Sequence, residues 1–141
     1  ILNPCKEMMD GVLEDGEAIG LHIRRKDYLT NPNHHFVGLD YYKKALSVFD
    51  NSTNVLVFSD DPAWCHNEPM FADDRFMISD NDSGYVDMCL MSMCTDFIIG
   101  NSSFSWWAAW LGNKGKVVAP KNWFPDPKDT SDLYCDGWIV V

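Results

Sequence analysis

Short apolar runs of strand type alternate along this chain with longer runs of helical type. The strand-type runs are residues 18–24, 54–59, 75–79, 96–99, 116–119 and 137–141. Strands that alternate with helices favour parallel βαβ units, and right-handed crossovers place helices on both faces of one open sheet. We therefore predict an α/β fold with a doubly wound, mostly parallel sheet.

The helical runs are residues 39–49, 62–66, 85–94 and 103–111. Asp61 and Pro62 are typical of an N-cap and a first helical position. Residues 85–94 are apolar nearly all round, which predicts a buried helix. Gly112 is expected to end the last helix.

In such a sheet, ligands lie beyond the carboxyl ends of the strands. The first strand continues into HIRRKDY, and the alternation of a strand places Gly20, His22 and Arg24 on one face. A guanidinium can bind phosphate oxygens in pairs, and an imidazole can donate or accept a hydrogen bond. The structural alternative is that Arg24 and Arg25 pair with Asp27 or with other surface acids.

Two other strand ends carry polar residues. At the fourth, a tight turn leads into a helix that Asn101, Ser102 or Ser103 can cap, and a helix N-terminus binds anions. We expect this junction to share a rim with Arg24, although ordinary capping explains it equally well. After the second strand, a carboxylate of the Asp60–Asp61 pair can accept hydrogen bonds from a ribose or a purine.

Composition restricts the function classes. A length of 141 residues fits one domain, and 46% hydrophobic with 23% charged residues is typical of a globular one. No apolar run reaches the ~18 residues of a membrane span. The net charge of −10 disfavours binding to nucleic acid and to anionic membranes, while a local arginine cluster can still bind a phosphate.

Several other motifs in the chain do not predict a functional site. The five cysteines (5, 65, 89, 94 and 135) lack zinc spacing, which favours reduced thiols. Asp80-Asn81-Asp82 has a metal-binding D-x-D spacing, but as a calcium loop it has Met91 where glutamate is required, and we expect no metal. The Asn-x-Ser/Thr triplets at 51, 81 and 101 are read as coincidence, and His34 and His35 as solvated. GxGxxG, Walker and GxSxG motifs are missing, which argues against NAD enzymes, P-loop ATPases and α/β-hydrolases.

Three runs together resemble a known family. HIRRKDYL (residues 22–29), VFSDDPAWC (57–65) and DFIIGNSSFSWWAAWLG (96–112) resemble the α-1,2-fucosyltransferases of glycosyltransferase family 11 in order and spacing. The resemblance implies inverting transfer of L-fucose from GDP-fucose to a galactose 2-hydroxyl, with no metal or other cofactor. It also implies a Rossmann-like fold, similar to the donor-binding half of a GT-B enzyme.

The resemblance also implies roles for individual residues. Arg24 would bind the β-phosphate and stabilise the leaving group, and His22 would contact the nucleotide. Asp27 is the candidate general base, or else it orients Arg25. The expected GDP-fucose site comprises His22, Arg24, Arg25, Ser59, Asp60, Asp61, Asn101, Ser102, Ser103 and Phe104.

The main departure from the family is length, since such enzymes are about twice as long. We expect residues 1–141 to form a single GDP-fucose-binding domain of a longer enzyme, with the acceptor-binding N-terminal half absent. No secretion signal is visible at Ile1. The missing half would bind the galactose-terminated glycan, and this fragment alone would bind donor but transfer fucose poorly.

The expected location is the bacterial cytoplasm, with peripheral membrane association of the full-length enzyme, or the Golgi membrane if the source is eukaryotic. Two alternatives stay open: a non-catalytic module that binds nucleotide sugars or glycans, and a scaffold whose arginine pair is structural.

Overall fold

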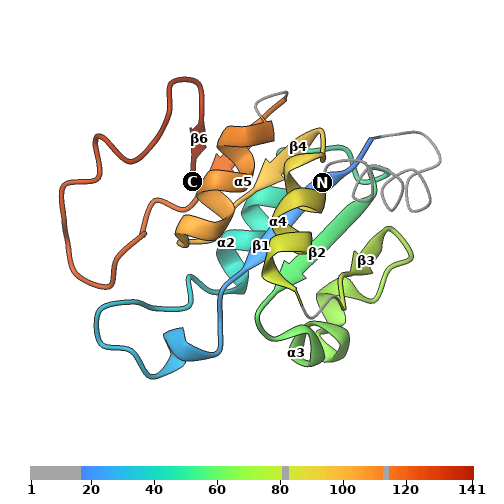
Figure 1. Ribbon diagram of the computed structural model, residues 1–141, viewed down its shortest axis with the longest axis horizontal. Helices are drawn as coiled ribbons and strands as arrows, with labels where there is room; N and C mark the ends of the chain where they lie inside the picture. Colours follow the sequence, from blue (N-terminus) through green and yellow to red (C-terminus); the bar gives the residue numbers. More distant parts are fainter. Residues whose placement is uncertain (1–16, 81–82, 113–114) are drawn as a thin grey trace.

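The strands of the described residues form one six-stranded sheet. The computed structural model describes residues 17–80, 83–112 and 115–141. Across the sheet the strands follow the order β3-β2-β1-β4-β5-β6, and each of these neighbouring pairs is parallel (Figure 1). The strands are β1 Ile19–Ile23, β2 Val55–Ser59, β3 Phe76–Ile78, β4 Asp96–Ile98, β5 Val117–Ala119 and β6 Ile139–Val140. Each lies inside the run that predicted it, and the predicted Rossmann-like α/β class is confirmed.

From β1 the chain continues to β2 and β3 on one side of the sheet and to β4, β5 and β6 on the other, so the strand order reverses between β1 and β4. β1 pairs with β2 so that Ile23 lies opposite Ser59, and the two strands therefore end at the same edge of the sheet. On its other side β1 pairs with β4, where Leu21 lies opposite Ile98. In open parallel sheets a ligand binds outside the carboxyl ends of the strands at such a reversal.

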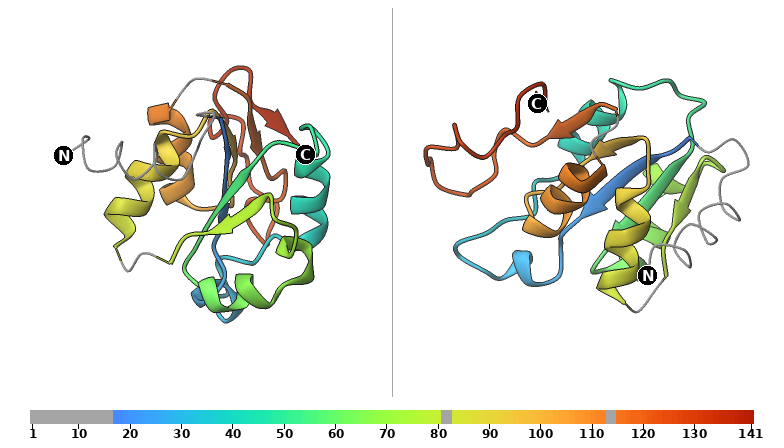
Figure 2. Two further views of the ribbon diagram at one scale, coloured as in Figure 1. Left: turned by 90° about the vertical axis from the view of Figure 1, so that its right-hand side faces the viewer. Right: turned by 45° about the horizontal axis from the view of Figure 1, so that its top comes forward.

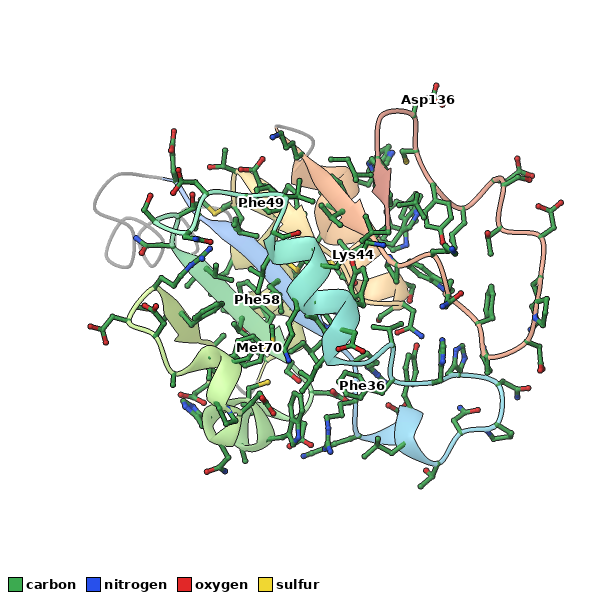
Figure 3. The ribbon with its side chains drawn as sticks, turned by 180° about the vertical axis from the view of Figure 1, so that it is seen from behind. Phe36, Lys44, Phe49, Phe58, Met70 and Asp136 are labelled. Carbon is green, nitrogen blue, oxygen red and sulfur yellow. The ribbon has the colours of Figure 1, made fainter. Side chains whose placement is uncertain are left out.

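Helices cover both faces of the sheet. The structure has α2 Leu39–Leu46, α3 Pro62–Asn67, α4 Gly84–Ser92 and α5 Ser103–Gly112, with short 3₁₀ turns η1 Asp27–Leu29 and η2 Pro69–Phe71 that were not predicted. Figure 2 shows α2 and α3 on one face and α4 and α5 on the other. Figure 3 shows the first face, with α2 and its Lys44 in front of the strands. Since strand residues alternate, the sheet supplies both cores: Leu21 packs in the α2 core and Phe97 in the α4–α5 core.

Local chemistry explains how α3 and α4 are placed. The Asp61 carboxylate accepts a hydrogen bond from the Trp64 N–H at 3.4 Å, which confirms the predicted cap of α3. Helix α4 lies close to β1 at Gly20, where an added Cβ would be 3.1 Å from Met91 Cγ and 3.2 Å from Cys94 Sγ. The missing side chain lets helix and strand approach.

The prediction of a buried helix at 85–94 is right for one side of α4 only. Leu90 and Met91 are buried against the sheet, whereas Tyr85 is 62% exposed. A single layer of helices on a sheet has an outer side in contact with water, whatever its sequence. The part of the chain that the structure describes contains no helix long and apolar enough to cross a membrane.

Candidate functional site

A cleft of about 380 Å³ opens at the carboxyl ends of β1 and β2, between the first turns of α4 and α5. This volume is within the usual range for small-molecule sites. Its walls combine charged and aromatic side chains with backbone, and they include His22, Arg24, Lys26, Ser59, Asp60 and Phe104. The expected position of the site, beyond the ends of parallel strands, therefore coincides with a real cavity.

His22 forms the inner wall of the cleft. Its side chain is buried, and its ring lies 4.8 Å from the ring of Phe104 between centroids. Its backbone oxygen accepts a hydrogen bond from the Tyr42 hydroxyl at 2.8 Å, which holds the end of β1. Burial, together with the positive charge of Arg24, lowers the pKa of His22 to about 3. The ring is therefore neutral near pH 7, and its Nδ1 has no hydrogen-bond partner among the described residues.

Arg24 lies on the same side of β1 as His22, and its guanidinium is held by Asp27. Arg24 Nε and Nη2 donate to the two Asp27 carboxylate oxygens at 3.0 and 2.8 Å. The Asp60 carboxylate is 3.7 Å away, and the guanidinium lies 5.4 Å from the centre of the Tyr28 ring. The hydrogen bond to Arg24 lowers the pKa of Asp27. The alternative expectation, that Asp27 orients Arg25, is wrong, because the Asp27 carboxylate binds Arg24 and the Arg25 guanidinium binds Asp61.

Arg25 points to the opposite side of the strand end and does not line the cleft. Its Nη1 donates to Asp61 Oδ2 at 2.8 Å, and its guanidinium lies 4.5 Å from the centre of the Trp64 ring and 6.0 Å from that of Phe36. The expectation that both guanidinium groups face one ligand is therefore wrong. Consecutive residues of an extended chain point in opposite directions, and the charge and aromatic partners of Arg25 lie on the α2–α3 side.

The two aspartates after β2 have different positions. The Asp60 carboxylate lines the cleft and accepts hydrogen bonds from the backbone N–H groups of Arg25 (2.8 Å) and Lys26 (3.0 Å). It therefore ties the end of β2 to the end of β1. Asp61 binds Arg25 and caps α3, and its N–H donates to the Ser59 hydroxyl at 3.0 Å. Asp60 is the carboxylate of this pair that a ligand in the cleft can reach.

The junction between β4 and α5 lies beside Arg24, as expected. The Ser102 hydroxyl accepts a hydrogen bond from the Phe104 N–H at 3.3 Å and so caps α5. Tyr28, whose ring lies under the Arg24 guanidinium, donates its hydroxyl to the Asn101 backbone oxygen at 3.1 Å. Consecutive residues of this junction face different cavities: Phe104 lines the cleft, and Ser103 lines a second cavity on the other side of the helix end.

Asn101 has a structural role that its sequence position did not reveal. Its amide nitrogen donates to the backbone oxygens of His35 (2.8 Å) and Trp123 (3.0 Å), and its side chain is buried. It therefore joins the loop after β1 to the loop after β5.

The expectation that His34 and His35 are merely solvated is wrong: His34 stacks on the Tyr28 ring at 4.7 Å, and His35 Nε2 contacts the Asn122 backbone oxygen at 2.6 Å.

Part of the cleft wall was not predicted from the sequence. Lys26, Phe58, Pro62, Gly84 and Asp87 also line it. The same alternation that selected Arg24 also selects Lys26, two residues further on. The remaining residues come from β2, α3 and α4, and their proximity depends on how these elements pack.

The D-x-D motif is only partly described. Asp80 Oδ1 lies 2.8 Å from His66 Nε2, while residues 81 and 82, and with them the triplet at 81, lie outside the described residues. Among the described residues no group of three or more His, Cys, Asp or Glu side chains is arranged to hold a metal ion.

Of the five cysteines, Cys5 lies outside the described residues. Burial raises the pKa of the Cys65 thiol to about 11, so this thiol is unreactive near pH 7.

Comparison with known proteins gives consistent matches. The sequence model of the family described as Glycosyl transferase family 11 matches residues 2–141. The chain is 36% identical over 153 aligned residues to the O-antigen biosynthesis glycosyltransferase WbnK of Escherichia coli, covering 99% of this chain and 50% of that protein. It is 38% identical over 150 residues to an alpha-1,2-colitosyltransferase of Escherichia coli, covering 97% and 51%. The chain thus spans about half the length of these relatives.

Two solved structures match part of this chain. One is NodZ alpha-1,6-fucosyltransferase soaked with GDP-fucose, with a TM-score of 0.47 and 17% identity over 77% of this chain and 41% of that one. The other is fucosyltransferase NodZ from Bradyrhizobium, with a TM-score of 0.46 and 18% identity over 77% and 42%.

Proposed function

Because this chain belongs to glycosyl transferase family 11, we propose that it supplies the donor-binding part of an α-1,2-fucosyltransferase. The enzyme would transfer L-fucose from GDP-fucose to the 2-hydroxyl of a galactose on a glycan. The name of the α-1,2-colitosyltransferase supports the linkage. Residues 1–141 would form one donor-binding domain, and the other half of the relatives' length would carry the main acceptor-binding part.

The observation that carries this proposal is that Arg24 and a neutral His22 line one cleft at the carboxyl ends of β1 and β2. A guanidinium presents two parallel N–H groups to two phosphate oxygens, so Arg24 suits the β-phosphate of GDP. Neutral His22 can hydrogen-bond the nucleotide without adding charge. Asp60 is the better candidate of the aspartate pair for the ribose or guanine, because it lines the cleft and Asp61 does not.

In the proposed reaction the bond between fucose C1 and the β-phosphate oxygen breaks while the acceptor oxygen attacks C1 from the opposite face. The configuration inverts, the bonding electrons go to the phosphate, and the acceptor proton goes to a base. Donors already aimed at the phosphate stabilise the charge that develops there. Arg24 and the first turn of α5, capped by Ser102, would supply them, and the proposal requires no metal.

Asp27 connects donor binding with the acceptor proton. Its carboxylate occupies the same guanidinium edge that a phosphate would use. Donor binding would therefore replace Asp27 by phosphate on Arg24 and release a carboxylate next to the reacting sugar. Because this exchange frees the Asp27 carboxylate to take the acceptor proton, we propose Asp27 as the general base.

We also propose the bacterial cytoplasm as the place of action, with peripheral membrane association of the full-length enzyme. The source of both curated relatives, Escherichia coli, supports a bacterial origin. The glycan and the lipid surface would be reached through the other half of the enzyme.

The test is Arg24→Gln in the intact protein, with Arg75→Gln as the matched control. Arg75 precedes β3 at the opposite end of the sheet, where its Nε donates to the Thr53 backbone oxygen. GDP affinity is measured by calorimetry, and transfer is measured with GDP-fucose and a β-galactoside, with GDP-colitose as a second donor. Loss of one charge-stabilising donor lowers turnover by about 10²–10³, so Arg24→Gln should do this and the control should not.

The outcomes separate the hypotheses. GDP binding that depends on Arg24, without transfer to any galactoside, would indicate a non-catalytic nucleotide-sugar module. GDP affinity and turnover unaffected by Arg24→Gln would show that the arginine is structural and would overturn the site.

A further inference from the structure

A second cavity, of about 390 Å³, lies on the other side of the first turn of α5. It is formed where the loop after β1 and the loop after β5 extend beyond the sheet on the same side (Figure 1). Its walls are mainly aromatic and include Tyr28, His34, Ser103, Trp106, Trp107 and Phe124. We propose that this cavity is a pyranose subsite that binds the acceptor sugar, an inference that rests on the proposed function.

The lining differs in charge from that of the donor cleft. No Asp, Glu, Lys or Arg of the described residues lines the second cavity, whereas Arg24, Lys26, Asp60 and Asp87 line the first. A phosphate or another ionic group would therefore find no Asp, Glu, Lys or Arg partner among the described residues that line the second cavity. Its aromatic rings and hydroxyls instead suit a neutral ligand with one apolar face and several hydroxyl groups. A pyranose ring has this chemistry.

The aromatic walls are held in place by the rest of the structure. The Tyr28 and His34 rings are stacked, 4.7 Å apart and 7° from parallel. Trp106 Nε1 donates to the Leu133 backbone oxygen at 2.7 Å, and the Trp106 and Trp107 rings contact edge to face at 5.0 Å. Trp107 is nevertheless 49% exposed, so its ring is accessible to a ligand. Preorganised aromatic surface reduces the entropy lost on binding.

The two cavities adjoin at the place where transfer would occur. Ser103 and Phe104 are consecutive in the first turn of α5, and they line the second cavity and the cleft respectively. Tyr28, a wall of the second cavity, lies under the guanidinium of Arg24, a wall of the first. A sugar against Trp107 and Ser103 would therefore lie beside the diphosphate on Arg24. This half of the enzyme then contributes to acceptor binding as well as to donor binding.

The experiment compares Trp107→Ala with Trp110→Ala in the intact protein. Trp110 is on the same helix, 51% exposed and not part of the cavity lining, and its ring contacts the Trp107 ring edge to face at 5.6 Å. Trp110→Ala therefore controls both for loss of a surface tryptophan and for loss of this contact to Trp107. Saturation-transfer NMR with methyl β-D-galactopyranoside tests binding without any need for activity. We expect the sugar signals in the wild type and in Trp110→Ala, and their loss in Trp107→Ala, with partial recovery in Trp107→Phe.

Kinetics provide the second readout. One aromatic stacking contact corresponds to roughly a three- to tenfold change in affinity, so Trp107→Ala should raise the KM for the galactoside by that factor while the GDP affinity stays unchanged. Equal behaviour of the two alanine variants in both measurements would overturn the subsite. Sugar contacts that depend on Trp107 in a protein that transfers no sugar would refute the proposed enzyme activity while supporting the subsite. An unchanged galactoside KM in an active Trp107→Ala enzyme would refute only the subsite.

Discussion

Removal of the buried imidazole of His22 should flatten the dependence of stability on pH. His22 is 4% exposed, and burial with the charge of Arg24 lowers its pKa from 6.5 to about 3. The unfolded chain therefore takes up a proton near pH 6.5 that the folded chain does not take up until about pH 3. Because the unfolded state binds more protons in this window, stability from this residue is present above pH 6.5 and is lost as the pH falls towards 3.

The size of the effect follows from the two pKa values. Each unit of pH below 6.5 costs about 1.4 kcal/mol until the folded state is also protonated. At pH 5 the loss relative to pH 8 is about 2 kcal/mol. The carboxylates titrate in wild type and variant alike, so their contribution cancels when the two proteins are compared.

The assay is urea denaturation of the wild type, His22→Leu and His22→Gln at pH 8 and pH 5. Either variant removes the titrating ring, and the two differ in how they pack against Phe104. The wild type should lose about 2 kcal/mol more than either variant between the two pH values. His66→Gln is the control, since that ring is on the surface and pairs with Asp80. Parallel losses in the wild type and both His22 variants would refute the assignment of a buried, neutral histidine.

Two further changes test the structure. Asp27→Asn removes the carboxylate that binds the Arg24 guanidinium, so calorimetry should show GDP binding up to about fivefold more tightly. If Asp27 is the general base, transfer by the same variant should fall by about 10² or more. Weaker GDP binding would contradict the proposed replacement of Asp27 by phosphate on Arg24. Gly112→Ala places a Cβ against the Phe97 ring and 2.7 Å from the Ser92 backbone oxygen. The free energy of unfolding, measured by thermal denaturation, should therefore fall by about 1–3 kcal/mol. A variant as stable as the wild type would argue against this packing.

Much of the fold follows from local pattern. Every observed strand lies inside a predicted run, and the alternation in β1 correctly separated Ile19, Leu21 and Ile23 from Gly20 and His22. These features depend on backbone geometry over a few residues, which the order of apolar and polar side chains reports directly. The exposed side of α4 was not predicted, because a uniformly apolar helix does not reveal which side faces the sheet.

Some features of the candidate site were likewise predicted from the sequence, and others were not. The sequence placed Arg24 and His22 on one face of a strand end, and it identified Asp61 as the cap of α3. It did not predict that Arg25 would face Asp61 and Trp64, since an ion pair between residues 36 positions apart depends on the register of two strands.

The second cavity shows what tertiary structure alone decided. Ser103 and Trp107 are four residues apart on α5 and share one face of it, but no spacing along the chain relates them to Tyr28 and Phe124, which come from two loops. Asn101 brings those loops together through hydrogen bonds to two backbone oxygens. The chain by itself therefore determined the strands, their faces and the end of the sheet where chemistry is expected, because these are properties of short segments. Which side chains share a cavity was decided only by packing, because that depends on contacts between segments far apart in sequence.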